Sequence, residues 1–153
     1  MHDLTPESLL AAVRDWVLIE SPTQDAAAVN RVADHAARLL AAIGARIERM
    51  AGEHGFGDIL IGRIAGQREG PGILLLGHMD TVHPVGTLAG PLPVRVTDGR
   101  AYGPGIYDMK GGNAIAFSAL AHLHATVRRP HLPVSVMMIP DEEAGSPFSR
   151  PHI

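Results

Sequence analysis

The 153-residue sequence contains no cysteine, few aromatic residues and no long apolar run. The absence of cysteine excludes disulfides and thiolate ligands, so a bound metal would be held by His, Asp or Glu. With aromatic residues at only 4%, the core must be filled by Leu, Ile, Val, Ala and Met. No apolar run approaches the roughly 20 residues of a membrane helix, and the charged N-terminal segment is unlike a signal peptide. These absences predict a cytoplasmic protein with no membrane partner.

Charge is also sparse, because charged residues make up 19% of the chain and the formal net charge is −3. No basic run or basic face stands out, so nucleic acid is not an expected partner. Hydrophobic residues make up 46% of the sequence, which is enough for one globular domain with a real core. The 17 glycines and 12 prolines predict many tight connections.

Three helices are predicted from local signals. Thr5-Pro6-Glu7 is typical of a helix start, with a hydroxyl cap, a proline and an acid in the first turn. A second amphipathic helix is expected to begin near Asp25 and to close at Gly44. The third runs from Gly112 to Val127 and is apolar enough to be largely buried. The residues of this helix expected to share one side and face the core are Ile115, Ala119 and Leu123.

Four strands are predicted between and after these helices, over Arg46–Met50, Asp58–Ile64, Ile73–Leu76 and Val134–Ile139. A hairpin is also predicted over Val94–Tyr102, with its turn at Asp98-Gly99. The run Ile73–Leu76 is continuously apolar, as in a strand buried on both faces. Strands alternating with helices predict an α/β fold with three layers, in which helices flank a mostly parallel mixed sheet. Ligands gather at the carboxyl ends of strands in such sheets.

The first stretch with chemistry is Gly77-His78-Met79-Asp80-Thr81-Val82, which directly follows an apolar strand. Two residues apart on an extended chain, His78 and Asp80 point to the same side. His78 can then bind a metal through one ring nitrogen while Asp80 holds the other N–H. Taken alone, a His-x-Asp pair also arises by chance in loops. His83 is the one other histidine worth testing as a ligand.

The second stretch is Gly103-Pro104-Gly105-Ile106-Tyr107-Asp108-Met109-Lys110-Gly111-Gly112. A carboxylate at Asp108, just ahead of a helix, stays ionised beside the free amides there, and a metal ligand must be ionised. An ordinary helix-capping aspartate is the alternative. Lys110 is expected to be a solvated or structural cation. Nucleotide binding at Gly103-x-Gly105 is a remote alternative, since the pattern of a phosphate-binding loop is missing.

The third stretch, Pro140-Asp141-Glu142-Glu143-Ala144-Gly145-Ser146, follows the last predicted strand. Adjacent side chains diverge, so one of Glu142 and Glu143 can bind metal while the other faces substrate as a general base. The spacing leaves open which glutamate has which role, and acid pairs at a strand end are often simply solvated.

Together, these three stretches resemble the motifs of the M20 family of metallopeptidases, which includes glutamate carboxypeptidase, dipeptidases, acetylornithine deacetylase and desuccinylases. Their order and intervals agree with that family from about Leu4 to the end of the chain. The resemblance implies hydrolysis of a peptide or N-acyl amide bond next to an amino acid. It also implies small peptides or N-acyl amino acids as substrates and a homodimeric full-length parent.

The resemblance further implies a site with two zinc ions, for which cobalt or manganese are possible substitutes. Asp108 would bridge the ions, His78 would bind one and Glu143 the other. Asp80 would steady His78, and Glu142 would be the general base. The Asp108–Met109 peptide would be cis. No other cofactor is expected.

Members of that family supply a further carboxylate and a further histidine beyond the third motif, together with a smaller dimerisation domain. Residues 1–153 are therefore expected to be the N-terminal portion of the catalytic domain, without the dimerisation (lid) domain or the C-terminal half. Each ion would keep two of its protein ligands, whereas catalytic zinc normally has three. This piece is expected to be nearly inactive alone. The alternative is a non-catalytic metal-binding or interaction module on the same scaffold.

Overall fold

The first two predicted helices begin where their capping residues lie. In the computed structural model, which describes residues 4–127 and 129–153, α1 spans Pro6–Val17 and α2 spans Ala26–Ala42. The Thr5 side chain accepts a hydrogen bond from the Ser8 amide at 3.3 Å. Asp25 caps α2 in the same way, and Gly44 follows it with φ +77°. The sequence predictions for both helices are confirmed.

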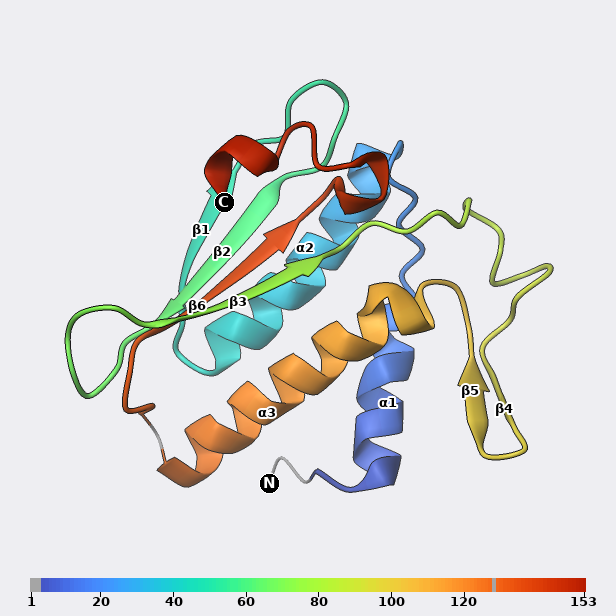
Figure 1. The fold of residues 1–153 in the computed structure, drawn as a ribbon. Helices are drawn as coiled ribbons and strands as arrows, with labels where there is room; N and C mark the ends of the chain where they lie inside the picture. The colour runs from blue at the N-terminus through green and yellow to red at the C-terminus, as the bar shows by residue number, and fades with distance from the viewer. Residues whose placement is uncertain (1–3, 128) are drawn as a thin grey trace.

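Four strands form the main sheet, in the order β1 (Arg46–Met50), β2 (Ile59–Ile64), β6 (Val134–Ile139) and β3 (Ile73–His78) (Figure 1). The pairs β1–β2 and β2–β6 are antiparallel, and β3–β6 is parallel. The α/β class with a mixed sheet is as predicted, but the sheet is not mostly parallel. The reason lies in the connections, because only β3 and β6 are joined through a crossover helix, which parallel neighbours require.

The helices α1, α2 and α3 (Gly111–Val127) lie on one face of this sheet. A Cβ on Gly62 of β2 would lie 2.7 Å from Leu40 of α2, and one on Gly77 of β3 would meet the Asn113 side chain of α3. Both glycines therefore let a helix approach the backbone of the sheet closely. They share a face because they pair with Val136 and Met138 of β6, two residues apart.

The opposite face of the sheet carries much less cover. Met137 and Ile139 pack there against Phe148, which precedes the short helical turn η3 (Arg150–His152). Among the described residues no α-helix covers this face, so the expected third layer is not seen in this part of the fold. None of the described helices has both the length and the apolar character of a membrane span.

Two burial predictions are wrong. The strand β3 is not buried on both faces, because it is the edge of the described sheet and leaves Leu74 51% and Leu76 44% exposed. In α3 the buried positions include Phe117 and Leu120, whereas Ile115 of the predicted stripe is 55% exposed. Ala119 is exposed too. The prediction failed because α3 is apolar on all sides, so its sequence cannot indicate which side faces the core.

The predicted hairpin is present as a separate two-stranded sheet. Its strands are β4 (Arg95–Thr97) and β5 (Arg100–Tyr102), and they pair antiparallel. The turn residues Asp98 and Gly99 have φ values of +50° and +71°, which suit a two-residue hairpin loop. This hairpin leads directly into the second motif.

Candidate metal centre

The three motifs meet at the carboxyl ends of two neighbouring strands. The strand β3 ends at His78, which pairs in register with Ile139 at the end of β6. The turn Ile106–Lys110, which carries Asp108, lies at the start of α3 and packs against that helix. Segments far apart in the sequence are thus brought together beside the carboxyl ends of β3 and β6 (Figure 1).

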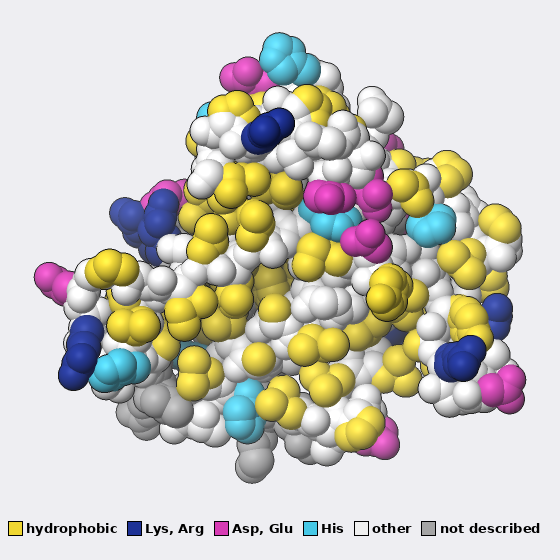
Figure 2. All heavy atoms as spheres, in the orientation of Figure 1, with side chains coloured by type: hydrophobic (Ala, Val, Ile, Leu, Met, Phe, Trp, Pro, Cys, Tyr) yellow, Lys and Arg dark blue, Asp and Glu magenta, His cyan; other side chains and the backbone are white. Residues whose placement is uncertain are grey.

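Three potential ligands lie close together there. One ligand atom each from His78, Asp108 and Glu143 falls within 4.8 Å of the others. The His78 Nε2 and Asp108 Oδ1 atoms are 2.9 Å apart. Figure 2 shows acidic side chains gathered around a histidine on this face. The predicted metal ligands therefore converge, and no other group of this kind occurs among the described residues.

The cluster is buried on the side of His78 and exposed to solvent on the side of Asp108. His78 and Asp80 are 4% and 1% exposed, whereas the Asp108 side chain is 68% exposed. The Asp108–Met109 peptide is cis, as the motif resemblance implied. The imidazole is thus fixed within the fold while the carboxylate faces solvent, so a cation or a substrate can approach from outside.

The buried Asp80 connects the first motif to the third. The Nδ1 atom of His78 lies 3.1 Å from the Asp80 carbonyl oxygen and 3.3 Å from its Oδ1. The same carboxylate accepts the backbone amides of Glu142 and Glu143, at 3.2 and 3.1 Å. Asp80 lies where the sequence predicted it, beside the second nitrogen of His78. Its contacts with the glutamate backbone were not predicted, because they depend on two strands lying side by side.

The sequence also matches a known family model. The description of that model is peptidase family M20/M25/M40, and the match covers residues 74–152, which contain all three motifs. The chain belongs to this M20 peptidase family. A carboxypeptidase G2 from a Pseudomonas species is 36% identical over 92% of this chain and 39% of its own length. A succinyl-diaminopimelate desuccinylase from Rhodopseudomonas palustris is 36% identical over 91% and 36%, respectively.

The fold of the chain is also similar to that of a solved peptidase structure. Human carnosine dipeptidase 1 superposes with a TM-score of 0.79 at 21% identity, over 95% of this chain and 34% of that protein. The chain thus spans less than half the length of these relatives. What the M20 comparison supports is the expected fold and family of this part.

The electrostatics of this M20 site favour a cation beside His78. Burial lowers the pKa of His78, but hydrogen bonds to Asp80 and Asp108 outweigh burial and raise that pKa to about 9. Burial, together with neighbouring carboxylates, raises the pKa of Glu143 although His78 opposes it. The cluster therefore carries an excess of negative charge, which a metal ion would relieve. Nitrogen and oxygen donors without sulfur fit zinc, cobalt or manganese.

The two adjacent glutamates differ in position. Glu143 contributes to the ligand cluster, whereas the Glu142 side chain is 49% exposed with its Oε2 3.9 Å from His78 Nε2. The roles of general base for Glu142 and metal ligand for Glu143 stay predictions. His83, the possible extra ligand, is not part of the cluster.

Lys110 is not solvated, since it is 1% exposed and donates to the Ile19 carbonyl oxygen. Burial lowers the pKa of Lys110 to about 8, with the charge of Glu20 opposing the shift. Glu20 in turn accepts the amides of Gly86 and Leu88, each at 2.8 Å. The structural alternative for Lys110 therefore holds, and it ties the second motif to the end of α1.

Sequence reasoning missed two residues that touch the motif loops. Thr23 Oγ1 donates to Asp80 Oδ2 at 2.8 Å, and Asn113 Nδ2 donates to the His78 carbonyl oxygen at 2.7 Å. Thr23 lies in the connection between α1 and α2, and nothing in the sequence around it signals a contact with Asp80. Asn113 directly follows Gly111-Gly112, and a polar residue in the first turn of a mostly apolar helix was the available signal.

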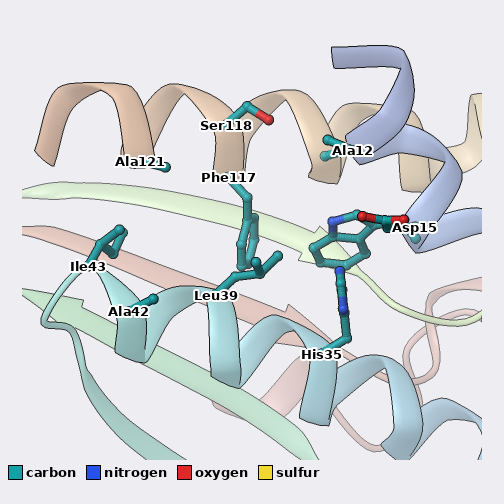
Figure 3. Close-up of a pocket in the computed structure, with 11 residues that line it drawn as sticks. Ala12, Asp15, His35, Leu39, Ala42, Ile43, Phe117, Ser118 and Ala121 are labelled. Atoms are coloured by element: carbon teal, nitrogen blue, oxygen red, sulfur yellow. The ribbon is translucent and has the colours of Figure 1, made fainter. Parts of the chain in front are cut away.

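A separate cavity of about 200 Å³ lies between α1, α2 and α3 (Figure 3). Its walls are mostly apolar and include Trp16, Leu39 and Phe117. The buried His35 Nε2 has no hydrogen-bond partner among the described residues, and the His35 ring lies perpendicular to Trp16 with centroids 5.2 Å apart. None of the residues that line this cavity belongs to the cluster of His78, Asp108 and Glu143.

Proposed function

We propose that this chain forms part of a metal-dependent hydrolase that cleaves a peptide or N-acyl amide bond next to an amino acid. The observation that carries the proposal is the convergence of His78, Asp108 and Glu143 within 4.8 Å. The relatives support it, since one is named a carboxypeptidase and another a desuccinylase. Both names denote breaking a bond between a carbonyl carbon and an amide nitrogen.

The proposed metal is zinc, held as a pair of ions. His78 would bind one ion, Glu143 the other, and the exposed Asp108 carboxylate would lie between them. Zinc supplies polarisation of the scissile carbonyl and lowers the pKa of a bound water from about 15.7 towards about 7. His78 is held in place by Asp80, whose carbonyl and carboxylate oxygens both face Nδ1. The other nitrogen, Nε2, is left for the ligand role.

Glu142 is the proposed general base. Its carboxylate is 49% exposed and lies on the open side of the cluster, 3.9 Å from His78 Nε2. There it can accept a proton from an attacking water and pass it to the leaving amine. Its backbone is fixed by the amide hydrogen bond to Asp80 at 3.2 Å. The backbone that carries this carboxylate is therefore held beside the cluster, although Glu142 is not a member of the cluster.

The test compares the two adjacent glutamates. The Zn²⁺ dissociation constant of the chain is measured by isothermal titration calorimetry for the unaltered protein, Glu143→Gln and Glu142→Gln. Removing a ligand should weaken binding by at least about tenfold, whereas Glu142→Gln should change it by less than about threefold. Thermal unfolding of the metal-free variants checks that each is folded. Equal Zn²⁺ binding by Glu143→Gln and the unaltered chain would refute this ligand set.

We further propose that this chain turns over substrate very slowly by itself. It supplies two ligands for each ion, counting Asp108 twice, and it spans 39% of the carboxypeptidase G2 relative. Catalytic zinc usually has three protein ligands. A longer parent, expected to be a homodimer acting on small peptides or N-acyl amino acids, would supply the rest. Hydrolysis of such substrates by the zinc-loaded chain at ordinary enzyme rates would contradict this.

A non-catalytic metal-binding or interaction module is the second candidate, and the small number of ligands on this chain favours it. The two candidates differ in what Glu142 does. In a hydrolase, Glu142→Gln in the full parent abolishes turnover while zinc stays bound. In a binding module, the unaltered parent has no turnover to lose against N-acyl amino acids or dipeptides. Activity assays with matched zinc analysis of both proteins therefore distinguish them.

A further inference from the structure

The connection between α1 and α2 runs beside the loop that follows β3. The Thr81 amide donates to the Ser21 carbonyl oxygen at 2.8 Å, and the Thr23 amide donates to the Thr81 carbonyl oxygen at 3.3 Å. Pro22 and Thr81 form an isolated parallel bridge. The Ser21 hydroxyl adds a hydrogen bond to the Met79 carbonyl oxygen at 2.7 Å. The segment 21–23 thus acts as a short extra strand beside the first motif.

The side chain of Thr23 reaches past the backbone to the Asp80 carboxylate. Its hydroxyl donates to Asp80 Oδ2 at 2.8 Å, across 57 positions of sequence. Both residues are buried, with 7% and 1% of their surfaces exposed. Water is therefore not available to replace the hydroxyl as a donor. The Thr23 bond is also the shortest hydrogen bond of that carboxylate, since the two amide bonds are 3.1 and 3.2 Å.

Each oxygen of the Asp80 carboxylate has two neighbours. Oδ1 faces the Glu142 amide and His78 Nδ1, and Oδ2 faces the Glu143 amide and the Thr23 hydroxyl. We propose that Thr23 is a positioning residue of the metal centre, which fixes the rotation of the Asp80 carboxylate. Through that carboxylate it orients the His78 ring and the backbone of Glu143. This inference rests on the proposed metal-binding function.

A purely structural role would have a different consequence. Thr23→Val keeps the shape of the side chain and removes only the hydroxyl, so one carboxylate oxygen loses its strongest donor. If Thr23 merely satisfied a buried group, the variant would unfold more easily but would bind metal as before. If it positions Asp80, the carboxylate can rotate, and ligand geometry is lost even in folded protein.

The experiment is Zn²⁺ titration of the unaltered chain, Thr23→Val and Thr23→Ser. Thr23→Val should weaken Zn²⁺ binding by about 10–100-fold, as is typical for partners of metal ligands. Thr23→Ser keeps the hydroxyl and should restore affinity to within about threefold of the unaltered chain. Thr23→Ala removes the same hydroxyl with a smaller side chain and must weaken binding as Thr23→Val does. Thermal unfolding without metal shows which variants are folded at the titration temperature.

Ser21→Ala is the matched control. It removes a buried hydrogen bond from the same segment, but one that ends on the Met79 carbonyl oxygen rather than on Asp80. It should lower the thermal midpoint and leave Zn²⁺ affinity within about threefold. On an Asp80→Asn background, Thr23→Val should add less than about threefold, because the group it acts through has changed.

The outcomes distinguish the role of Thr23 from the existence of the metal centre itself. Equal Zn²⁺ affinity in Thr23→Val and the unaltered chain overturns the role of Thr23 and leaves the metal centre standing. A loss in Ser21→Ala as large as in Thr23→Val also overturns it, since the segment would then act only through general packing. No Zn²⁺ uptake by the unaltered chain overturns the proposed function and this inference together.

Discussion

His78 combines burial with an unusually high affinity for a proton. Burial lowers the pKa of this imidazole, but the neighbouring Asp80 and Asp108 carboxylates raise it to about 9. The proton on Nε2 then lies beside Asp108 Oδ1 at 2.9 Å, in the middle of the ligand cluster. The metal-free protein therefore keeps one positive charge where a divalent cation would supply two.

We expect Zn²⁺ to compete with this proton. A metal ligand must be the neutral imidazole, and His78 is protonated below about pH 9 in the metal-free chain. Zn²⁺ affinity should therefore rise by up to about tenfold per pH unit between about pH 6 and 8 and level off above about 9. Calorimetry in buffers of different ionisation enthalpy measures the proton released.

A matched control for the pH dependence is His83→Gln, which changes a histidine outside the cluster and should leave the profile unaltered. Zn²⁺ affinity that stays constant between about pH 6 and 8 would contradict a protonated His78.

The three residues that converge could be predicted from sequence, but the contacts that support them could not. His78, Asp108 and Glu143 stand at strand ends or before a helix, which are positions that a linear sequence reveals. The bonds from Asp80 to the two glutamate amides, and from Thr23 to Asp80, join segments about 60 positions apart. Such contacts depend on which strands become neighbours, and the residues themselves carry no local sign of it.

At the scale of single elements, the sequence predicts where helices and turns begin better than it predicts which side of a helix is buried. The starts of α1 and α2 and the turn of the β4–β5 hairpin follow from capping and turn residues, and all were predicted. The exposed side of α3 depends on what packs beside it. A helix that is apolar all round gives no periodic signal, so the stripe at Ile115 was chosen wrongly.

Two substitutions in α3 test its orientation. Phe117 is 6% exposed and contacts Trp16 with ring centroids 4.9 Å apart, so Phe117→Ala should cost about 3–5 kcal/mol of unfolding free energy. Ile115 is 55% exposed, so Ile115→Ala should change it by no more than about 0.5 kcal/mol. Urea unfolding measures both. Equal costs would mean that α3 is rotated from the orientation described.

At the scale of the whole molecule, the sheet is covered unevenly. The helices pack on one face, while the edge strand β3 leaves Ile73, Leu74 and Leu76 between 44% and 51% exposed. None of the residues Ile73–His78 is Lys, Glu or Pro, which commonly protect sheet edges from pairing with other chains. An unprotected apolar edge favours association between copies.

The isolated chain is therefore expected to self-associate at high concentration, and Leu76→Lys should increase the monomer fraction. Size-exclusion chromatography with light scattering over a range of concentrations measures this. Val85→Lys places the same charge at another exposed apolar residue, 58% exposed and outside the sheet, and should have little effect. A monodisperse monomer at the highest concentration would show that the edge does not drive association.

The parallel pairing of β3 with β6 sets His78 opposite Ile139. Because side chains alternate along a strand, sliding β3 by a single residue would turn the imidazole to the helix-covered side and bring a neighbour to the surface in its place. A chain misaligned in this way would keep nearly the same secondary structure but would lack the proposed zinc site. If the chain binds zinc as proposed, zinc uptake would distinguish molecules with the correct β3–β6 register from misaligned molecules that circular dichroism would count as folded.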